Sequence, residues 1–325
     1  MKARLLRPSS AVIFITVAAS LSGSVVSAAP THVVRRGAAV RTGAASTAAV
    51  SYSVEVPIVT RVVGTAFFRT AIDISNNTIA SPVTARFQYS YTRIGAGGFF
   101  RTPIESITLL GFDNFHTDDF VQYVGTIPGA LESGADQSSF GTLLVTFEGL
   151  PSSQGWEGTV FARTYSANPA GIGTVAIAYP ASLFFESANS TLVATIRDTQ
   201  LSPTEAGALR TNIGIRNTDI RGSNLPVTVE LEFYDATTGS PTSGRLIGQR
   251  LSLPNLQPGE VRQLNDIRSM ASIPPQASAI LVFADVVNAT ATSPTIEGYI
   301  NILDGGTQDG AFFEMKCADT DGCGN

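Results

Sequence analysis

The chain has 325 residues, and its 21 Lys and Arg against 26 Asp and Glu give a formal net charge of −5. It carries two His and two Cys, and after Lys2 its single lysine is Lys316. These counts argue against a nucleic-acid partner, against a Walker lysine and against a Schiff-base lysine in the body of the chain.

The first 28 residues predict a cleaved signal peptide. Three basic residues precede an apolar stretch from Ala11 to Ala19, and Val26-Ser27-Ala28 supplies small residues for cleavage before Ala29. The apolar stretch is well short of the ~20 residues of a transmembrane helix, so we expect no membrane insertion. Removing residues 1–28 leaves 18 basic residues (21 minus 3) against 26 acidic ones, a net charge of −8. We expect the mature protein outside the cytoplasm: secreted, on the cell surface or in the periplasm.

Residues 29–51 are rich in Ala, Thr, Ser, Gly and Arg without a hydrophobic period, which predicts a flexible leader. From Tyr52 to about Glu314, short runs of Val, Ile, Thr and Phe alternate with polar residues between clusters of turn formers. This pattern is typical of strands, and no convincing amphipathic helix interrupts it. The fold class is therefore predicted to be all-β.

A strand motif occurs twice, as FFRTAIDISN (Phe67–Asn76) and ALRTNIGIRN (Ala208–Asn217). The period of two predicts one buried face in each copy. Arg69 and Arg210 fall on the opposite, exposed side, where we expect them to be solvated or salt-bridged. The closing asparagines are expected to hydrogen-bond nearby backbone. The predicted buried sets are Thr70, Ile72, Ile74 and Asn76 in the first copy and Thr211, Ile213, Ile215 and Asn217 in the second.

The following strand is also repeated, as PVTARFQY (Pro82–Tyr89) and PVTVELEFY (Pro226–Tyr234), with three extra residues in the second turn. Weaker correspondences follow along both copies. Each copy holds six or seven strands in about 130 residues, which predicts a two-sheet sandwich. We predict a first β-sandwich over residues 52–187, a second over 188–314, and a C-terminal tail over 315–325.

The repeated Arg-Thr strand, the Val-x-Val-x-Leu strand and the later Arg-Thr-Tyr-Ser strand together resemble repeat domains of large secreted proteins from environmental bacteria. The resemblance covers about Tyr52–Glu314. It implies tandem Ig-like or fibronectin-like sandwiches without an assigned activity. No catalytic residue is carried over with it.

Few residues here suit catalysis. His32 lies in the leader, which leaves His116 as the one histidine of the predicted folded part, and no G-x-S-x-G motif is present. His116 and Asp118 in FHTDDF have the spacing of a partial metal site, but no second histidine completes it, so we interpret this segment as a polar loop between the sheets. A pair of carboxylates for glycoside hydrolysis stays open, because only geometry identifies such a pair.

Three aromatic residues on loops of the first sandwich, Phe99, Phe100 and Trp156, are candidates for stacking on a sugar; the alternative is that they close the core. Cys317 and Cys323 are expected to form a small disulfide loop in an exported protein, a redox pair being the alternative. The acidic turns near Asp304, Asp309 and Asp319 are interpreted as ordinary turns, with weak calcium binding as the alternative.

Together these features predict a non-catalytic secreted or cell-surface protein with a structural or adhesive role and without a cofactor. A cell-surface or polysaccharide partner is expected. The alternatives are a carbohydrate-binding accessory module and, third, a secreted hydrolase.

Overall fold

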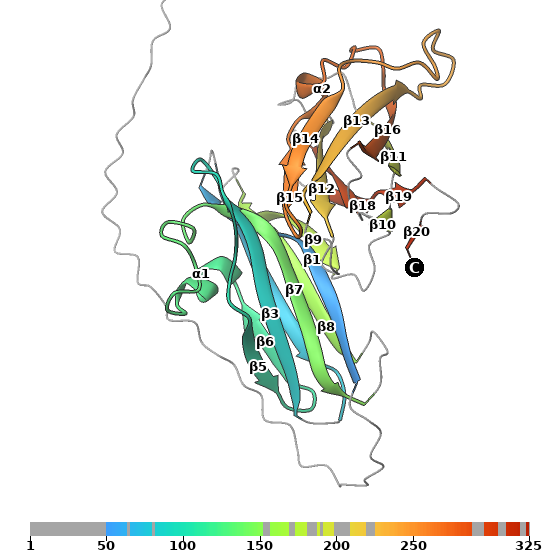
Figure 1. The fold of residues 1–325 in the computed structure, drawn as a ribbon. Coiled ribbons are helices and arrows are strands. Elements are labelled where there is room, and N and C mark those ends of the chain that lie inside the picture. Colours follow the sequence, from blue (N-terminus) through green and yellow to red (C-terminus); the bar gives the residue numbers. More distant parts are fainter. Residues whose placement is uncertain are drawn as a thin grey trace, which may run out of the picture. The chain divides into compact units, whose positions relative to one another are not determined.

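The computed structural model describes residues 50–63, 66–79, 82–151, 157–168, 173–180, 187–188, 191–197, 209–218, 225–287, 296–304, 310–318 and 323–324. The predicted signal peptide and nearly all of the predicted leader lie outside these ranges. The described part is built from strands with two short helices, which confirms the all-β prediction (Figure 1).

The described residues of the first half form nine strands and one helix. Their bounds are β1 (Val50–Val63), β2 (Phe67–Asn76), β3 (Val83–Arg93), β4 (Phe99–Arg101), β5 (Glu105–Leu109), β6 (Asn114–Thr117), α1 (Phe120–Gly125), β7 (Ser139–Leu150), β8 (Gly158–Ala167) and β9 (Thr174–Pro180).

The second half contains the remaining strands and helix. Their bounds are β10 (Ser187–Ala188), β11 (Thr191–Arg197), β12 (Leu209–Asn217), β13 (Val227–Asp235), β14 (Leu251–Leu256), β15 (Val261–Leu264), α2 (Ile267–Met270), β16 (Ala279–Val286), β17 (Ile296–Asp304), β18 (Gly310–Glu314), β19 (Lys316–Cys317) and β20 (Cys323–Gly324).

Strand pairing in the first half makes two layers from one continuous antiparallel sheet. One layer has the order β4-β3-β7-β1, with β5 also beside β3, and the other has the order β2-β8-β9, with β6 beside β2. β1 joins them, because it pairs with β7 over most of its length and with β2 from Arg61 to Val63. Its register shifts between Val56 and Val59, around Pro57, which has no N–H to donate to a ladder.

The same pairings recur in the second half. β12 lies between β15 and β17, as β2 lies between β6 and β8; β13 lies between β14 and β16, as β3 lies between β5 and β7. β11 pairs with β16 as β1 pairs with β7, and β18 pairs with β17 as β9 pairs with β8. The predicted duplication of one sandwich is therefore present in the strand pairing.

The repeated motif is buried at the predicted positions. Ile72 and Ile74 on β2, like Ile213 and Ile215 on β12, have no exposed area. Burial of such side chains stabilises the fold by about 1.5–3 kcal/mol each. Buried apolar residues form two clusters, one mainly from strands β1 to β9 and one mainly from the elements β11 to β17 with Met315.

Two features differ from the sequence prediction. β12 is buried on both faces, because the Tyr299 ring lies over Gly214 and Asn212 accepts a hydrogen bond from the Asp266 amide. The sequence analysis also missed α1 and α2. Each follows an aspartate, Asp119 or Asp266, whose side chain accepts a backbone N–H of the first turn, so each helix is held by its N-cap.

Each short helix crosses between the two layers of its sandwich. α1 leads from β6, beside β2, to β7, beside β3, and α2 leads from β15 to β16 in the corresponding way. The second sandwich continues past Glu314: Met315 is fully buried in its core and β19 pairs with β11.

Candidate binding face of the first sandwich

The outer face of the β6-β2-β8-β9 layer collects the polar and aromatic side chains that alternate with the core residues. Register places Arg69 opposite Tyr165, and Ala71 opposite Arg163. One row further along, Asp73 lies opposite Phe161 on one side and His116 on the other. Directly opposed side chains on one face of an antiparallel pair lie within contact distance, so this register assembles the site.

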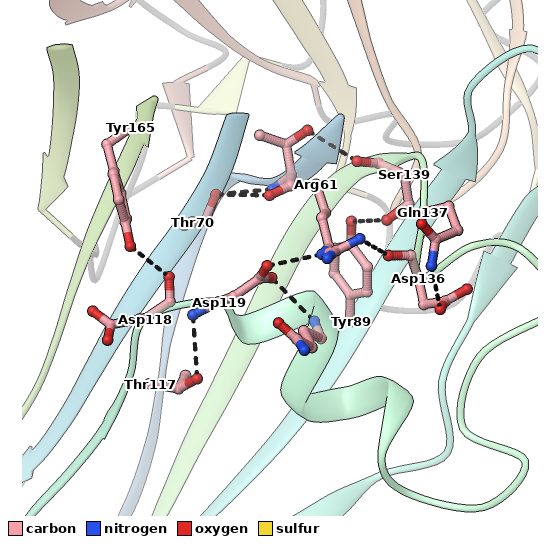
Figure 2. A network of polar contacts seen from close by, with 12 residues as sticks. Arg61, Thr70, Tyr89, Thr117, Asp118, Asp119, Asp136, Gln137, Ser139 and Tyr165 are labelled. Carbon is pink, nitrogen blue, oxygen red and sulfur yellow. Dashed lines mark hydrogen bonds and ion pairs between the residues drawn. The ribbon is translucent and has the colours of Figure 1, made fainter. Parts of the chain in front are cut away.

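Tyr165 lies between two guanidinium groups. The Cζ of Arg69 is 4.9 Å from its ring centroid and the Cζ of Arg163 is 5.3 Å away. The ring is mostly buried, and its hydroxyl donates a hydrogen bond of 3.1 Å to the carbonyl of Asp118 (Figure 2). Burial raises the pKa of Tyr165, with the Arg69 charge opposing that shift, so the hydroxyl stays protonated as a donor.

Phe67 continues this arrangement toward β1. The Cζ of Arg61 is 4.9 Å from the Phe67 centroid, and that of Arg69 is 6.0 Å from it. Arg61, Phe67, Arg69, Tyr165 and Arg163 thus alternate cation and ring across three strands; we call these five residues the arginine ladder. Cation–π contacts at partly exposed sites contribute about 0.5–1 kcal/mol each and hold the guanidinium planes in place.

The three arginines of the ladder differ in how their charge is matched. Arg61 Nε is 2.8 Å from Asp119 Oδ2, and its Nη1 donates to the Asp136 carbonyl at 2.5 Å (Figure 2). Arg163 donates to the Thr174 hydroxyl at 2.5 Å. Among the described residues, neither Arg69 nor Arg163 forms an ion pair. The ladder therefore presents two partly exposed guanidinium groups that have no carboxylate partner within the described ranges.

Asp119 does two things at once. Its Oδ2 binds Arg61, and its Oδ1 accepts the Gln122 amide at 3.1 Å, which caps α1. Its side chain is only 6% exposed, so its charge is matched almost entirely by these groups. Figure 2 also shows a second set of buried contacts, in which Thr60, the residue before Arg61, donates its hydroxyl to the Ser139 carbonyl and its amide to Thr70 Oγ1, while Tyr89 hydrogen-bonds the Ser139 hydroxyl.

His116 lies at the other edge of this face, between two carboxylates. Its Nδ1 is 2.8 Å from Asp73 Oδ1 and its Nε2 is 3.4 Å from Asp118 Oδ1. Partial burial lowers the pKa of His116, but the hydrogen bond and charge of Asp73 and the charge of Asp118 outweigh this effect, so the pKa lies above its usual value. Asp73 also accepts a bond of 3.2 Å from Asn114.

This histidine lies on strand β6, where the sequence predicted a loop between the sheets; the crossing itself follows Thr117 through Asp118 and α1. In the part of the chain that the structure describes, no group of three or more His, Cys, Asp or Glu side chains is arranged to hold a metal ion. Of the acidic turn residues named from the sequence, Asp309 and Asp319 lie outside the described ranges.

The predicted stacking residues do not form one described site. Phe100 on β4 stacks on Tyr91 with the ring centroids 5.6 Å apart and packs against the core. Phe99 carries the Arg101 guanidinium over its ring at 5.5 Å. Trp156 lies outside the described residues. A shared sugar-stacking role for these three stays a prediction.

Both cysteines belong to short strands of the second sandwich. Cys317 pairs with Leu192 and Cys323 pairs with Ala188 in the backbone register. The bond between the two sulfur atoms stays a prediction.

The sequence analysis did not identify the arginine ladder, although its signal is present. In FARTYSA, period-two alternation places Phe161, Arg163 and Tyr165 on one face of β8. The second sandwich has Asn301 and Leu303 at the positions of Arg163 and Tyr165, as its register with β12 shows. The ladder is therefore a feature of the first copy alone among the described strands.

The chain matches no protein-family model and no curated protein sequence. Neither of the helices in the described residues has the length and apolar character needed to cross a bilayer.

Proposed function

We propose that this protein is an exported, non-catalytic β-sandwich protein that serves a structural or adhesive role at a cell surface. The supporting observation is the duplicated sandwich with one elaborated face. Both copies keep corresponding strand pairings and a capped crossing helix, while among the described strands the first alone adds the arginine ladder. A repeated scaffold whose two outer faces differ suits attachment to a surface better than it suits catalysis.

Three titratable groups have contacts that serve the scaffold. Both carboxylate oxygens of Asp119 accept hydrogen bonds, one from Arg61 and one from the first-turn amide of α1. His116 lies between Asp73 and Asp118 on an open sheet face. Asp235 accepts from Ser240, Thr242 and Thr237, which holds its turn together and lowers its pKa far below the usual range. These contacts favour a structural use of polar residues.

A carbohydrate-binding accessory module is the second candidate. One observation favours it: Phe161 is 48% exposed on the same outer face as Arg163, where an apolar ring can lie against the C–H face of a sugar.

Three measurements test the leading proposal. Native export should yield a mature chain beginning at Ala29 by N-terminal sequencing, and fractionation should place it with the cell envelope or extracellular material. Purified mature protein should then bind intact cells in a saturable manner. A protein that stays in the culture medium and does not bind cells, or one with robust hydrolytic turnover abolished by a carboxylate substitution, would contradict the proposal.

A further inference from the structure

The outer face of the first sandwich holds two arginines, Arg69 and Arg163, that have no acidic partner in the part of the chain that the structure describes. Arg69 and Arg163 occupy neighbouring strands and diagonal positions, a separation of about 7–8 Å between Cα atoms in an antiparallel pair. Both side chains are partly exposed, and both contact the Tyr165 ring. Because the ring already restrains both arginine side chains, they lose little further conformational entropy when a ligand binds.

We propose that this face binds a polysaccharide that carries carboxylate or sulfate groups, with Arg69 and Arg163 as the anion-contacting residues and Phe161 as the sugar-contacting residue. The proposal rests on the surface-binding role above and names its ligand class. A guanidinium group presents paired N–H donors that match the oxygens of a carboxylate or sulfate. It is also more weakly hydrated than an ammonium group, so its desolvation on ligand binding costs less free energy.

Charge on this face supports an anionic ligand. The nearby acids already have partners: Asp119 binds Arg61, while Asp73 and Asp118 share His116. His116 can match only one of its two carboxylates, so with His116 protonated the three aspartates, the histidine and Arg61, Arg69 and Arg163 leave one excess positive charge on this face. The chain as a whole has a net charge of −5 over the full sequence. General attraction to polyanions is therefore weak, and a local site has to supply the affinity.

The shape of the face supports a polymer. Phe161, Arg163 and Tyr165 follow one another along β8 at every second position, about 7 Å apart. Ala71 and Ala178 lie on either side of Arg163 in the register, so the side chains beside it are short. The result is an open row with an exposed ring and cations, which an extended sugar chain can follow.

The test uses the full mature chain and three defined polymers. Polygalacturonate supplies carboxylates, dextran sulfate supplies sulfates, and unmodified dextran has neither. Binding is measured by titration calorimetry at low salt and in about 0.5 M NaCl, where exposed charge interactions are screened. We expect binding to at least one polyanion, weakened by salt, and none to dextran.

Matched variants locate the site. The double variant R69A/R163A should weaken polyanion binding by about tenfold or more, since two charge-assisted contacts are lost. The double variant R69K/R163K keeps the positive charges but loses the planar guanidinium groups. Its polyanion affinity should lie between that of R69A/R163A and that of the wild type. Phe161→Ala should also weaken binding to the polyanion, because the apolar contact with a sugar ring is lost.

Arg86→Ala is the control, because Arg86 is an exposed arginine of the opposite layer, 3.0 Å from Glu148. It should bind like the wild type. Urea midpoints of all variants establish that each is folded. The proposal is wrong if R69A/R163A binds the polyanions like the wild type, or if Arg86→Ala loses as much affinity as R69A/R163A does. It is also wrong if neither polyanion binds the wild type. Cell binding that persists in R69A/R163A would leave the surface role standing while rejecting this site.

Discussion

Asn76 in the first sandwich and Asn217 in the second make the same buried contact. Each ends its strand with almost no exposed area. Asn76 Nδ2 donates to the Leu110 carbonyl at 3.0 Å, and Asn217 Nδ2 donates to the Leu256 carbonyl at 2.9 Å. Each amide therefore ties the end of one layer to the segment that leaves the other layer, and the duplicated copies retain this connection.

Replacing either asparagine by alanine should destabilise the protein by about 1–3 kcal/mol, because buried carbonyl groups lose their donor. Equilibrium unfolding in urea measures the change for Asn76→Ala and Asn217→Ala. Asn114→Ala is the control, since Asn114 is exposed and makes its bonds to Ser75 and Asp73 at the surface. Equal midpoints for all three variants would show that the buried amides are not important for stability.

Asp119 should matter far more than its neighbour Asp118. Asp119→Ala removes the α1 cap and leaves Arg61, 15% exposed, without its counter-charge, so we expect a loss of about 2–3 kcal/mol. Asp119→Asn keeps a cap acceptor and should lose less. Asp118 is 77% exposed, and Asp118→Ala should leave the midpoint of chemical unfolding near that of the wild type. The reverse order would contradict the assigned network.

His116 should titrate above the usual histidine value of about 6.5. The protonated form is favoured in the folded state by Asp73 and Asp118, so its contribution to stability is complete below the unfolded pKa and is lost as pH rises through the folded pKa. NMR titration of the imidazole ring protons measures the pKa of His116, and His32 is the one other histidine in the sequence. Asp73→Asn should lower the pKa of His116. An unchanged value would mean that the contact does not persist in solution.

Gly141 is required by the close approach of two strands. A Cβ at this position would overlap the carbonyl oxygen of Ser90 and lie 2.7 Å from the Cα of Tyr91. Gly141→Ala should therefore cost about 1–3 kcal/mol, through displacement of β3 from β7. Gly125→Ala provides the control, because a Cβ there meets its nearest atom at 3.4 Å, an ordinary contact. Thermal unfolding of both variants should show a lowered midpoint for Gly141→Ala alone.

Period-two alternation was enough to predict several elements. The buried faces of β2 and β3, the correspondence of each strand with its copy, β12 or β13, and the duplication itself all follow from which side chains must leave water. The short helices were missed because six or four residues are too few to show a helical period, and the Asp119 cap was interpreted as part of a polar loop.

Much less of the candidate site could be predicted from the sequence. The sequence placed Arg69 and Arg210 on exposed sides and treated them as a matched pair. It did not indicate that Tyr165 lies across from Arg69 while Leu303 lies across from Arg210. That difference depends on residues 96 and 93 positions further along the chain, respectively, and local pattern carries no information about such neighbours.

The alternation of apolar and polar residues thus determined the fold class, the repeat and the side of each strand that faces the core, because these depend on burial within one strand. Tertiary structure decided which outward side chains meet. Strand register brings Arg69, Tyr165 and Arg163 within contact distance, and cation–π and hydrogen-bond energies fall off over a few ångströms, so only that register creates the arginine ladder.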